Sequence, residues 1–276
     1  MSVGQRMATA MLGMALAVGW TPPAAAEIVD PTGYDSILRR IVRAGQVDYN
    51  TLATRRMHLE RYLEALAEVD THSGTRDEQM ALWINAYNAG TLRLLLDHYP
   101  LRRSSLVGYL FPEKSLLQIE GAWNRAQLRV GGVRFSLNEI AHKILRKRFQ
   151  QPLVLFALAS GARGSPRLRG EAYLGPGLQA QLESSARAYL DDPEHGFRID
   201  REARSVWVSR LFLWYGRDFV AGYAEGPLSQ TGRFSQTEAA ALHFIRQRRP
   251  AEERAFLDRG EFRLRYLGHD WMLNGR

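Results

Sequence analysis

The sequence predicts an α+β fold in one domain, with several helices packed on a small mixed or antiparallel sheet that includes hairpins. Stretches of helical length with apolar periodicity alternate with short strand-like stretches, and two pairs of these strands are joined by turn sequences. No internal repeat and no low-complexity linker interrupts residues 27–276. We therefore expect these residues to form a single domain.

The N-terminal segment, 1–26, has the pattern of a secretory signal peptide. Arg6 precedes an apolar stretch from Met7 to Trp20, and Ala24–Ala26 resembles a small-residue cleavage site. The apolar stretch is shorter than the roughly 20 residues that span a bilayer, so cleavage before Glu27 is favoured over a membrane anchor. The prediction is a periplasmic or secreted protein with no integral membrane segment after cleavage.

Composition narrows the chemistry. The 276 residues carry a formal charge of +8 and include no cysteine, which excludes disulfides, thiolate nucleophiles and a lipid-bearing cysteine. The basic residues are dispersed and follow no nucleic-acid-binding motif. They indicate either a solvated surface or contact with a partner, which would be an envelope protein or an anionic polymer.

Helices are expected over 33–44, 57–69, 76–98, 137–149, 176–191, 210–221 and 236–247. Two of them begin with a capping box, in which the side chains of two residues three apart satisfy free amides at the helix start. The first box is Thr75 with Glu78, and the second is Ser136 with Glu139. The helix over 76–98 is apolar nearly all round, which predicts burial.

Strands are expected in four places. The stretch 126–137 reads as a hairpin, because Gly131-Gly132 suits a two-residue turn with positive φ. "FRIDREARSVWVS" predicts a second hairpin and "EFRLRYL" a late strand. The continuous apolar run 153–158 predicts a strand that is buried on both faces, and "GQVDYNTL" a turn into an extended segment.

Asn85 and Asn88 are the first candidate site residues. They lie three apart, on one face of the apolar helix 76–98. A buried amide must be hydrogen-bonded. Either both side chains tie this helix to a neighbouring loop or strand, or one of them orients a catalytic group or a ligand at the wall of a pocket.

Glu139, His142 and Arg146 form one stripe of the helix 137–149. His142 is either a packing residue or a general base, because neutral imidazole titrates in the useful range. Glu139 could bind a ligand, although it also caps the helix. A metal site is not expected, because the sequence has no second Glu-x-x-His and no His-x-x-x-His motif. No cofactor is predicted.

The loop "ASGARGSPRLR", 159–169, follows the apolar run 153–158. Ser160 or Ser165 could be a nucleophile if a base lies nearby, but the Gly-x-Ser-x-Gly signature is absent. Arg163 and Arg167, with Arg169, could bind an anionic ligand. The alternative is a turn without chemistry.

The segments "SRLFLWYGRDF" and "YLGHDWMLN" are interpreted as packing. Trp214 and Tyr215 are expected in the core, and Asp218 could pair with a buried cation. Asp270 and Trp271 are interpreted as an anchor for the C-terminal tail.

Seven stretches of the sequence match the motifs of a known protein family, in the same order along the chain. They are "VDYNTL", "WINAYNAGTLRLLLDHYP", "FSLNEIAHKILR", "FALASGARGSP", "AYL", "SRLFLWYGRDF" and "YLGHDWMLN". Over about 47–274 the chain resembles the domain-of-unknown-function family 547 (DUF547). The resemblance does not imply any particular activity. It implies that the members of the family are exported bacterial proteins or extensions of larger plant and animal proteins.

The chain departs from the family in one loop. Relatives carry two cysteines where this sequence has Ser160 and Ser165, and a histidine where it has Leu155. In the family, a cysteine hydrolase would use the equivalent of His142 as base, with Asn85 or Asn88 to orient it. Loss of both cysteines together favours a structural pair in relatives instead.

Two functions remain open. The first is a periplasmic protein that binds an envelope ligand in a cleft between the Asn85/Asn88 helix, the His142 helix and the 159–169 loop. The alternative is a peptidase-like or amidase-like hydrolase with His142 as base and Ser160 or Ser165 as nucleophile.

Overall fold

The computed structural model describes residues 28–103, 107–125 and 127–276, so the predicted signal peptide lies outside the described residues. The fold is α+β, as predicted.

The α-helices are α1 Thr32–Ile41, α2 Tyr49–Thr54, α3 Arg56–Ala67, α4 Arg76–Asp97, α5 Lys147–Phe149, α6 Leu178–Leu190, α7 Arg210–Tyr215, α8 Arg217–Tyr223, α9 Gln236–Arg246 and α10 Ala251–Arg259. The strands are β1 Val42–Arg43, β2 Gln46–Val47, β3 Leu128–Val130, β4 Val133–Phe135, β5 Phe197–Asp200, β6 Ser205–Val208 and β7 Arg263–Tyr266.

Short helices of other types connect these elements. The 3₁₀ helices are η1 Val107–Leu110, η2 Leu116–Gln118, η3 Ala122–Asn124, η5 Pro152–Phe156 and η6 Pro227–Gln230. One π-helix, η4, covers Glu139–Arg146.

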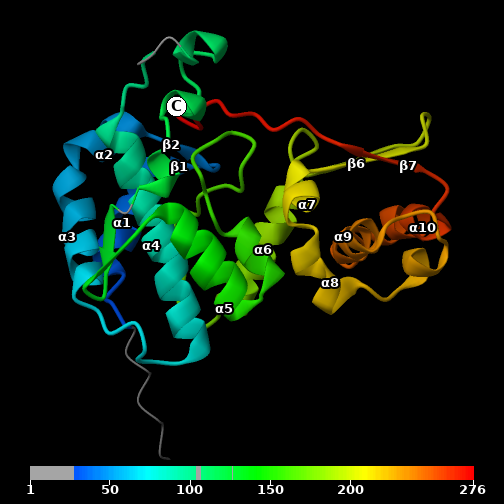
Figure 1. Cartoon of the computed structure of the whole chain (residues 1–276), viewed down its shortest axis with the longest axis horizontal. Helices are drawn as coiled ribbons and strands as arrows, with labels where there is room; N and C mark the ends of the chain where they lie inside the picture. The colour runs from blue at the N-terminus through cyan, green and yellow to red at the C-terminus, as the bar shows by residue number, and fades with distance from the viewer. Residues whose placement is uncertain (1–27, 104–106, 126) are drawn as a thin grey trace, which may run out of the picture.

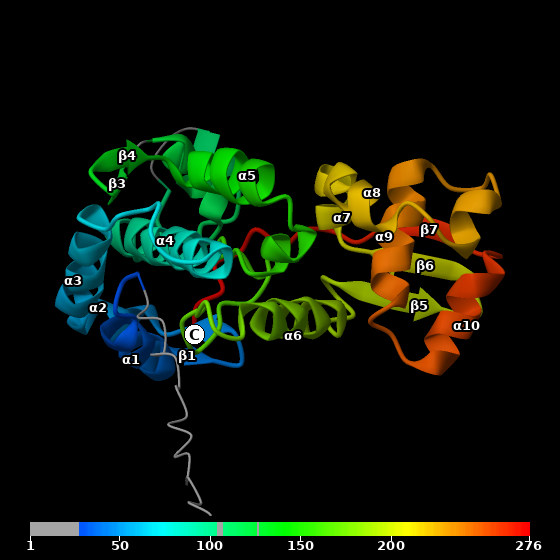
Figure 2. The same cartoon turned by 90° about the horizontal axis from the view of Figure 1, so that it is seen from below.

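The elements lie in two neighbouring groups (Figures 1 and 2). One group holds α1–α6 with the hairpins β1–β2 and β3–β4, and the other holds α7–α10 with the sheet β5–β6–β7. The segment after β7 runs back to the first group and ends beside β2, where Gly275 pairs with Val47. A connected hydrophobic core extends from Tyr34 in α1 to Leu273 in this last segment.

The predicted hairpins and the late strand are confirmed. Gly131 and Gly132 have φ of 55° and 79°, the conformation that a two-residue hairpin turn requires, and Val130 pairs with Val133 across it. β5 and β6 form the second hairpin, and β7 adds to β6 in parallel, so this sheet is mixed.

The capping boxes correctly predicted where two helices begin. Thr75 accepts from the Glu78 amide at 3.3 Å, and Glu78 accepts from the Thr75 amide at 2.5 Å. Ser136 and Glu139 make the same reciprocal pair, each bond 3.1 Å long. The second helix differs from the prediction in its winding, since residues 139–146 form a π-helix before α5 completes the turn.

The strand predicted over 153–158 is wrong. Residues 152–156 form the 3₁₀ helix η5, which has Pro152 in its first turn. Proline presets the helical φ and lacks an amide to offer a neighbouring strand. The run is apolar throughout because it is buried on every side, with Phe156 stacked on Phe244 at 5.2 Å between ring centroids.

Three other predictions need correction. The helix expected over 210–221 is two helices, which meet at Gly216. The extended segment expected within "GQVDYNTL" is limited to β2, and the chain continues as the helix α2, which Asp48 caps by accepting from the Thr51 amide at 2.9 Å. The helix expected over 33–44 ends at Ile41, since the chain turns through Ala44 and Gly45 into the hairpin β1–β2. Helix α10 was not anticipated.

Candidate functional site

A cavity of about 500 Å³ opens between the two groups of elements. Its wall is mostly apolar and aromatic, and eight polar side chains complete it. The apolar and aromatic lining residues are Tyr87, Phe111, Leu116, Leu117, Ile119, Trp123, Ala141, Leu155, Leu158, Pro166, Tyr189, Leu211, Trp214, Tyr215 and Trp271. The polar ones are Gln118, Glu120, Asn138, His142, Arg146, Ser160, Ser165 and His269.

The π-helix η4 brings His142 to this wall. Its N-terminus is fixed by the Ser136–Glu139 capping box, and its Ile140 and Leu145 side chains are buried in the core. π-turns inside helices are rare and occur frequently at functional sites. The helix therefore holds the imidazole on a backbone that is anchored at its start and along its apolar face.

Arg146 contacts His142 and Asp218 at once. Its Nε and Nη2 donate to the two Asp218 carboxylate oxygens at 2.6 and 2.8 Å. Its Nη1 lies 2.7 Å from His142 Nδ1, and its guanidinium carbon lies 4.3 Å from the centre of the Tyr215 ring. Asp218 was expected to pair with a buried cation; it pairs with Arg146, but both side chains are only partly buried, with 22% of Asp218 and 23% of Arg146 exposed.

The pKa of His142 is lowered from its ordinary value. Burial of the ring is the main cause, the positive charge of Arg146 adds to it, and Asp218 opposes both. The imidazole is therefore neutral at neutral pH. Because an arginine can only donate hydrogen bonds, Nδ1 is the acceptor and the proton of the neutral ring lies on Nε2.

The loop 159–169 contributes Ser160 and Ser165 to the cavity wall. The Ser165 hydroxyl is buried and donates to the Ala162 carbonyl at 2.7 Å. Ser160 is only partly buried, and no hydrogen bond joins its hydroxyl to another residue in the described ranges. Ser160 is thus the serine whose hydroxyl is available to a ligand.

The C-terminal segment forms another part of the wall, which the sequence did not predict. Gly164 donates its amide to the Asp270 carbonyl at 2.9 Å, and Arg163 donates to the Met272 carbonyl at 2.8 Å. These bonds align the tail with the serine loop and bring His269 and Trp271 to the cavity. The tail is anchored, as expected, but its His269 and Trp271 side chains also line the site.

Aromatic rings gather where this wall reaches the surface. Trp271 lies 4.3 Å from His269 and 6.1 Å from Trp214, between ring centroids. The two tryptophans remain 38% and 43% exposed. Burial is the largest cause that lowers the pKa of His269, to about 4, and the nearby His195 adds to it. The only signal in the sequence was the aromatic and histidine content of two stretches interpreted as packing.

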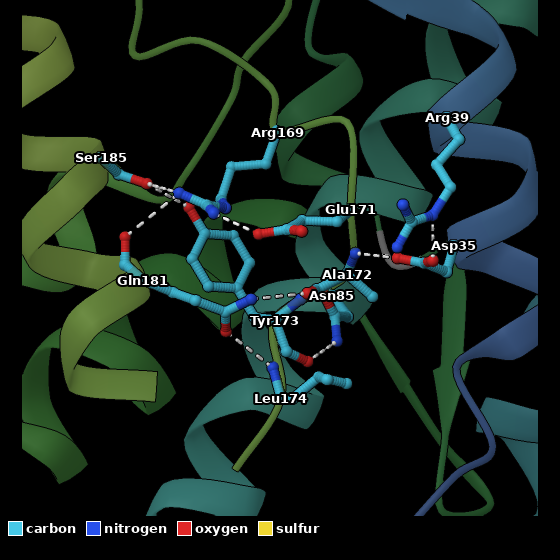
Figure 3. A network of polar contacts seen from close by, with 10 residues as sticks. All are labelled: Asp35, Arg39, Asn85, Arg169, Glu171, Ala172, Tyr173, Leu174, Gln181 and Ser185. Atoms are coloured by element: carbon cyan, nitrogen blue, oxygen red, sulfur yellow. Dashed lines mark hydrogen bonds and ion pairs between the residues drawn. The ribbon is translucent and has the colours of Figure 1, made fainter. Parts of the chain in front are cut away.

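Asn85 and Asn88 lie outside the cavity lining. Asn85 donates to the Tyr173 carbonyl at 2.7 Å and accepts from the Tyr173 amide at 2.9 Å (Figure 3). Asn88 spans Ala157 and Ala159 in the same way, at 2.9 and 3.0 Å. Both side-chain amides thus tie α4 to neighbouring chain segments. This is the structural alternative of the two that the sequence left open for Asn85 and Asn88.

The segment around Tyr173 is held from other elements as well. The Ala172 amide donates to Asp35 in α1 at 2.9 Å, and the Leu174 amide donates to Gln181 in α6 at 2.9 Å (Figure 3). Asn85 therefore works within a structural junction of α1, α4 and α6. By contrast, Asn88 binds the chain that leads into the serine loop.

The remaining candidates also lie outside the cavity lining. Glu139 is engaged by Ser136 and by Lys143, whose ammonium group at 2.8 Å is the main cause that lowers the Glu139 pKa to about 2. Arg167 pairs with Asp192 at 3.1 Å, and the exposed Arg163 contributes its backbone to the tail. The cavity brings together His142, Ser160 and Ser165 from the sequence candidates.

Two features are absent from the described parts of the chain. No group of three or more His, Asp or Glu side chains there is placed to hold a metal ion. Within the same ranges, no helix is both long and apolar enough to span a bilayer.

Comparison with known proteins gives one match. A family described as "Protein of unknown function, DUF547" matches residues 71–190, a narrower range than the resemblance noted above. Neither a curated protein nor a solved structure matches the chain. The matched range includes His142, Arg146 and both serines, whereas Asp218 and the C-terminal wall lie beyond it. Residues 71–190 of the chain are therefore similar to the DUF547 family of proteins of unknown function.

Proposed function

We propose that this protein binds a small, largely apolar organic ligand of the cell envelope in the cavity beside His142. The observation that carries the proposal is the cavity itself: about 500 Å³, with a mostly apolar and aromatic wall and a minority of polar side chains. Ligand pockets in proteins have volumes of about 300–1,000 Å³ and this same composition. The polar groups would fix the orientation of the ligand while the rings bind its body.

The rim of the cavity supports binding. Trp214, Trp271 and Leu117 are each more than a third exposed there, which is unfavourable for large apolar side chains unless a ligand or partner covers them. Aromatic rings offer a large contact area and lose little conformational freedom on binding. A flat apolar group would therefore bind at this rim.

The proposed location is the periplasm or the outside of the cell. Its support is the sequence of residues 1–26, with Arg6, the apolar stretch Met7–Trp20 and the small residues Ala24–Ala26. The positive charge of the chain would favour an anionic envelope polymer or an acidic envelope protein as partner.

Binding is tested with the neutral fluorescent probe N-phenyl-1-naphthylamine. Saturable fluorescence enhancement is expected with the intact protein, and about tenfold weaker affinity with Trp214→Ala or Trp271→Ala, because each removes a large contact area. Trp207→Ala is the matched control: Trp207 lies on β6 between Arg198 and Arg265, outside the cavity. Absence of saturable binding, or equal losses in all three variants, would contradict the proposal.

Hydrolysis is the second candidate. Ser160 and His142 line the same cavity, and this favours a nucleophile and base pair. The arrangement of His142 weighs against it, because Arg146 occupies Nδ1 and the other nitrogen carries the proton. A base needs an unprotonated nitrogen toward the hydroxyl.

A fluorophosphonate probe separates the two candidates. An activated serine reacts covalently with it, so a hydrolase would be labelled at Ser160, and Ser160→Ala would abolish the label. Ser165→Ala serves as the comparison, because the Ser165 hydroxyl already donates to the Ala162 carbonyl. Absence of labelling by mass spectrometry would reject the serine nucleophile.

A further inference from the structure

Arg146 and Asp218 determine which hydrogen-bonding role His142 can play. The two residues form a two-point ion pair, with Arg146 Nε and Nη2 at 2.6 and 2.8 Å from the Asp218 oxygens. The remaining terminal nitrogen, Nη1, lies 2.7 Å from His142 Nδ1. A guanidinium has donors and no acceptor, so Nδ1 accepts this bond and the proton of the neutral ring is on Nε2.

The pair also holds this tautomer in place. The guanidinium cannot rotate away from His142 without losing a bond to Asp218, and its carbon lies 4.3 Å from the centre of the Tyr215 ring. A planar guanidinium fixed at two points loses little further freedom in making a third bond. The imidazole is therefore oriented by a second residue that is itself anchored, as in the metal and catalytic sites of other proteins.

The Nε2–H group is left without a partner. No other hydrogen bond of the His142 imidazole exists in the described residues, and Nε2 is not among the buried polar atoms that lack partners. Since His142 lines the cavity, this N–H is the polar atom that the ring offers to a ligand. A donor of fixed direction requires an acceptor.

We infer that the cavity binds its ligand through a carbonyl or carboxylate oxygen, which accepts a hydrogen bond from His142 Nε2–H. This inference rests on the proposed binding function and names the ligand class. The charges around His142 agree with this inference. A ligand ammonium group beside Nε2 would face an N–H donor and lie near the positive Arg146 guanidinium, so its binding there is unfavourable. The oxygen would bind at His142, and the apolar body would extend toward Trp214 and Trp271.

The first test measures the His142 tautomer and needs no ligand. Two-bond ¹H–¹⁵N correlation of the intact protein is expected to show His142 protonated at Nε2 and unprotonated at Nδ1. In the double variant Arg146→Met with Asp218→Asn, which removes both charges together, the Nδ1–H form should appear. Lys143→Met is the control on the same helix: Lys143 is 72% exposed and pairs with Glu139, so the tautomer should not change. An Nδ1–H ring in the intact protein would overturn the inference.

The second test compares three probes that share one ring system: 2-naphthamide, 2-naphthoate and 2-naphthylmethylammonium. Calorimetry is expected to give the first two probes at least about tenfold higher affinity than the third, the usual effect of one net hydrogen bond. A preference for naphthoate over naphthamide would identify a carboxylate ligand, and the reverse a neutral carbonyl. His142→Phe should bring all three affinities together while the protein remains folded by circular dichroism.

The outcomes separate this inference from the proposed function. If the ammonium probe binds as tightly as the amide, the cavity binds ligands and the inferred oxygen preference is wrong. If none of the three probes binds and N-phenyl-1-naphthylamine also fails, the proposed function is rejected and the ligand class is rejected with it. The tautomer measurement still decides the role of Arg146 in that case.

Discussion

Tyr49 donates its hydroxyl to Asn274 Oδ1 at 2.9 Å, although 225 residues separate the two in the chain. Both residues are buried. This bond fixes the end of the C-terminal segment against α2, and the Val47 amide binds the Asn274 carbonyl beside it at 3.1 Å. The segment between β7 and Asn274 is thereby fixed at both ends, so its own side chains keep a defined position at the cavity.

Asn274→Ala should destabilise the protein by about 1–3 kcal/mol, because it leaves the buried Tyr49 hydroxyl without a partner. Urea unfolding measures the change. Arg276→Ala is the control: its ion pair with Asp48 is long, at 3.7 Å, and partly exposed, so the loss should stay below about 0.5 kcal/mol. If the two substitutions lower the free energy of unfolding equally, the hydrogen bond between Tyr49 and Asn274 contributes no more to stability than the exposed ion pair.

Asn85→Ala and Asn88→Ala should each lower the free energy of unfolding by about 2–6 kcal/mol, since each leaves a buried amide and a buried carbonyl without a partner at roughly 1–3 kcal/mol per group. The two variants should differ in their effect on the cavity. Asn88 binds Ala157 and Ala159 next to the serine loop, whereas Asn85 binds Tyr173 away from it. Probe affinity measured under folding conditions should fall for Asn88→Ala and stay within about twofold for Asn85→Ala.

Asn50→Ala provides the reference for both asparagine variants, because Asn50 is exposed on α2. Its free energy of unfolding should change by less than about 0.5 kcal/mol. If Asn85→Ala and Asn88→Ala also remain in this range, the two side chains do not carry the structural role that their hydrogen bonds indicate.

Local signals in the sequence predicted much of the fold. The boxes at Thr75 and Ser136 satisfy helix amides within three residues, so they can be recognised without knowledge of the rest of the chain. The glycine pair at 131–132 is similarly local. The run 153–158 misled because an apolar stretch does not distinguish a buried strand from a buried helix, and Pro152 was the only local sign against a strand.

The site was harder to predict because part of its wall comes from residues that are distant in sequence. His142, Ser160 and Ser165 stood out by residue type, and they do share the cavity. His269 and Trp271 come to it only through backbone bonds between the tail and the serine loop. Pairing over such a separation leaves no periodic or turn signal, so those residues were interpreted as packing.

The pH dependence of stability should include a contribution from His269. Its pKa is lowered from about 6.5 to about 4, by burial first, then by His195 and Arg210, with Asp270 opposing. The unfolded chain therefore binds more protons than the folded one between these values, and stability falls as the pH drops through this window. Above about pH 6.5 the contribution is constant.

Urea midpoints measured from pH 4 to 7 test this contribution. His269→Gln should flatten the dependence, because glutamine does not titrate. His142, whose pKa is also lowered, accounts for part of the slope that remains. A slope that is the same in His269→Gln as in the intact protein would contradict the assignment.

Gly164→Ala should displace the tail and weaken ligand binding. A β-carbon on residue 164 would lie 2.6 Å from the Asp270 amide nitrogen and 3.1 Å from His269 Nδ1, and the first of these atoms is backbone that cannot yield cheaply. Overpacking of this kind costs about 1–3 kcal/mol.

Gly170→Ala is the matched control on the adjoining stretch, because its β-carbon meets no atom within 4 Å. The free energy of unfolding and the affinity for N-phenyl-1-naphthylamine should both fall in Gly164→Ala. Both should stay unchanged in Gly170→Ala. Intact binding in a destabilised Gly164→Ala protein would mean that the tail contributes stability to the fold without shaping the cavity.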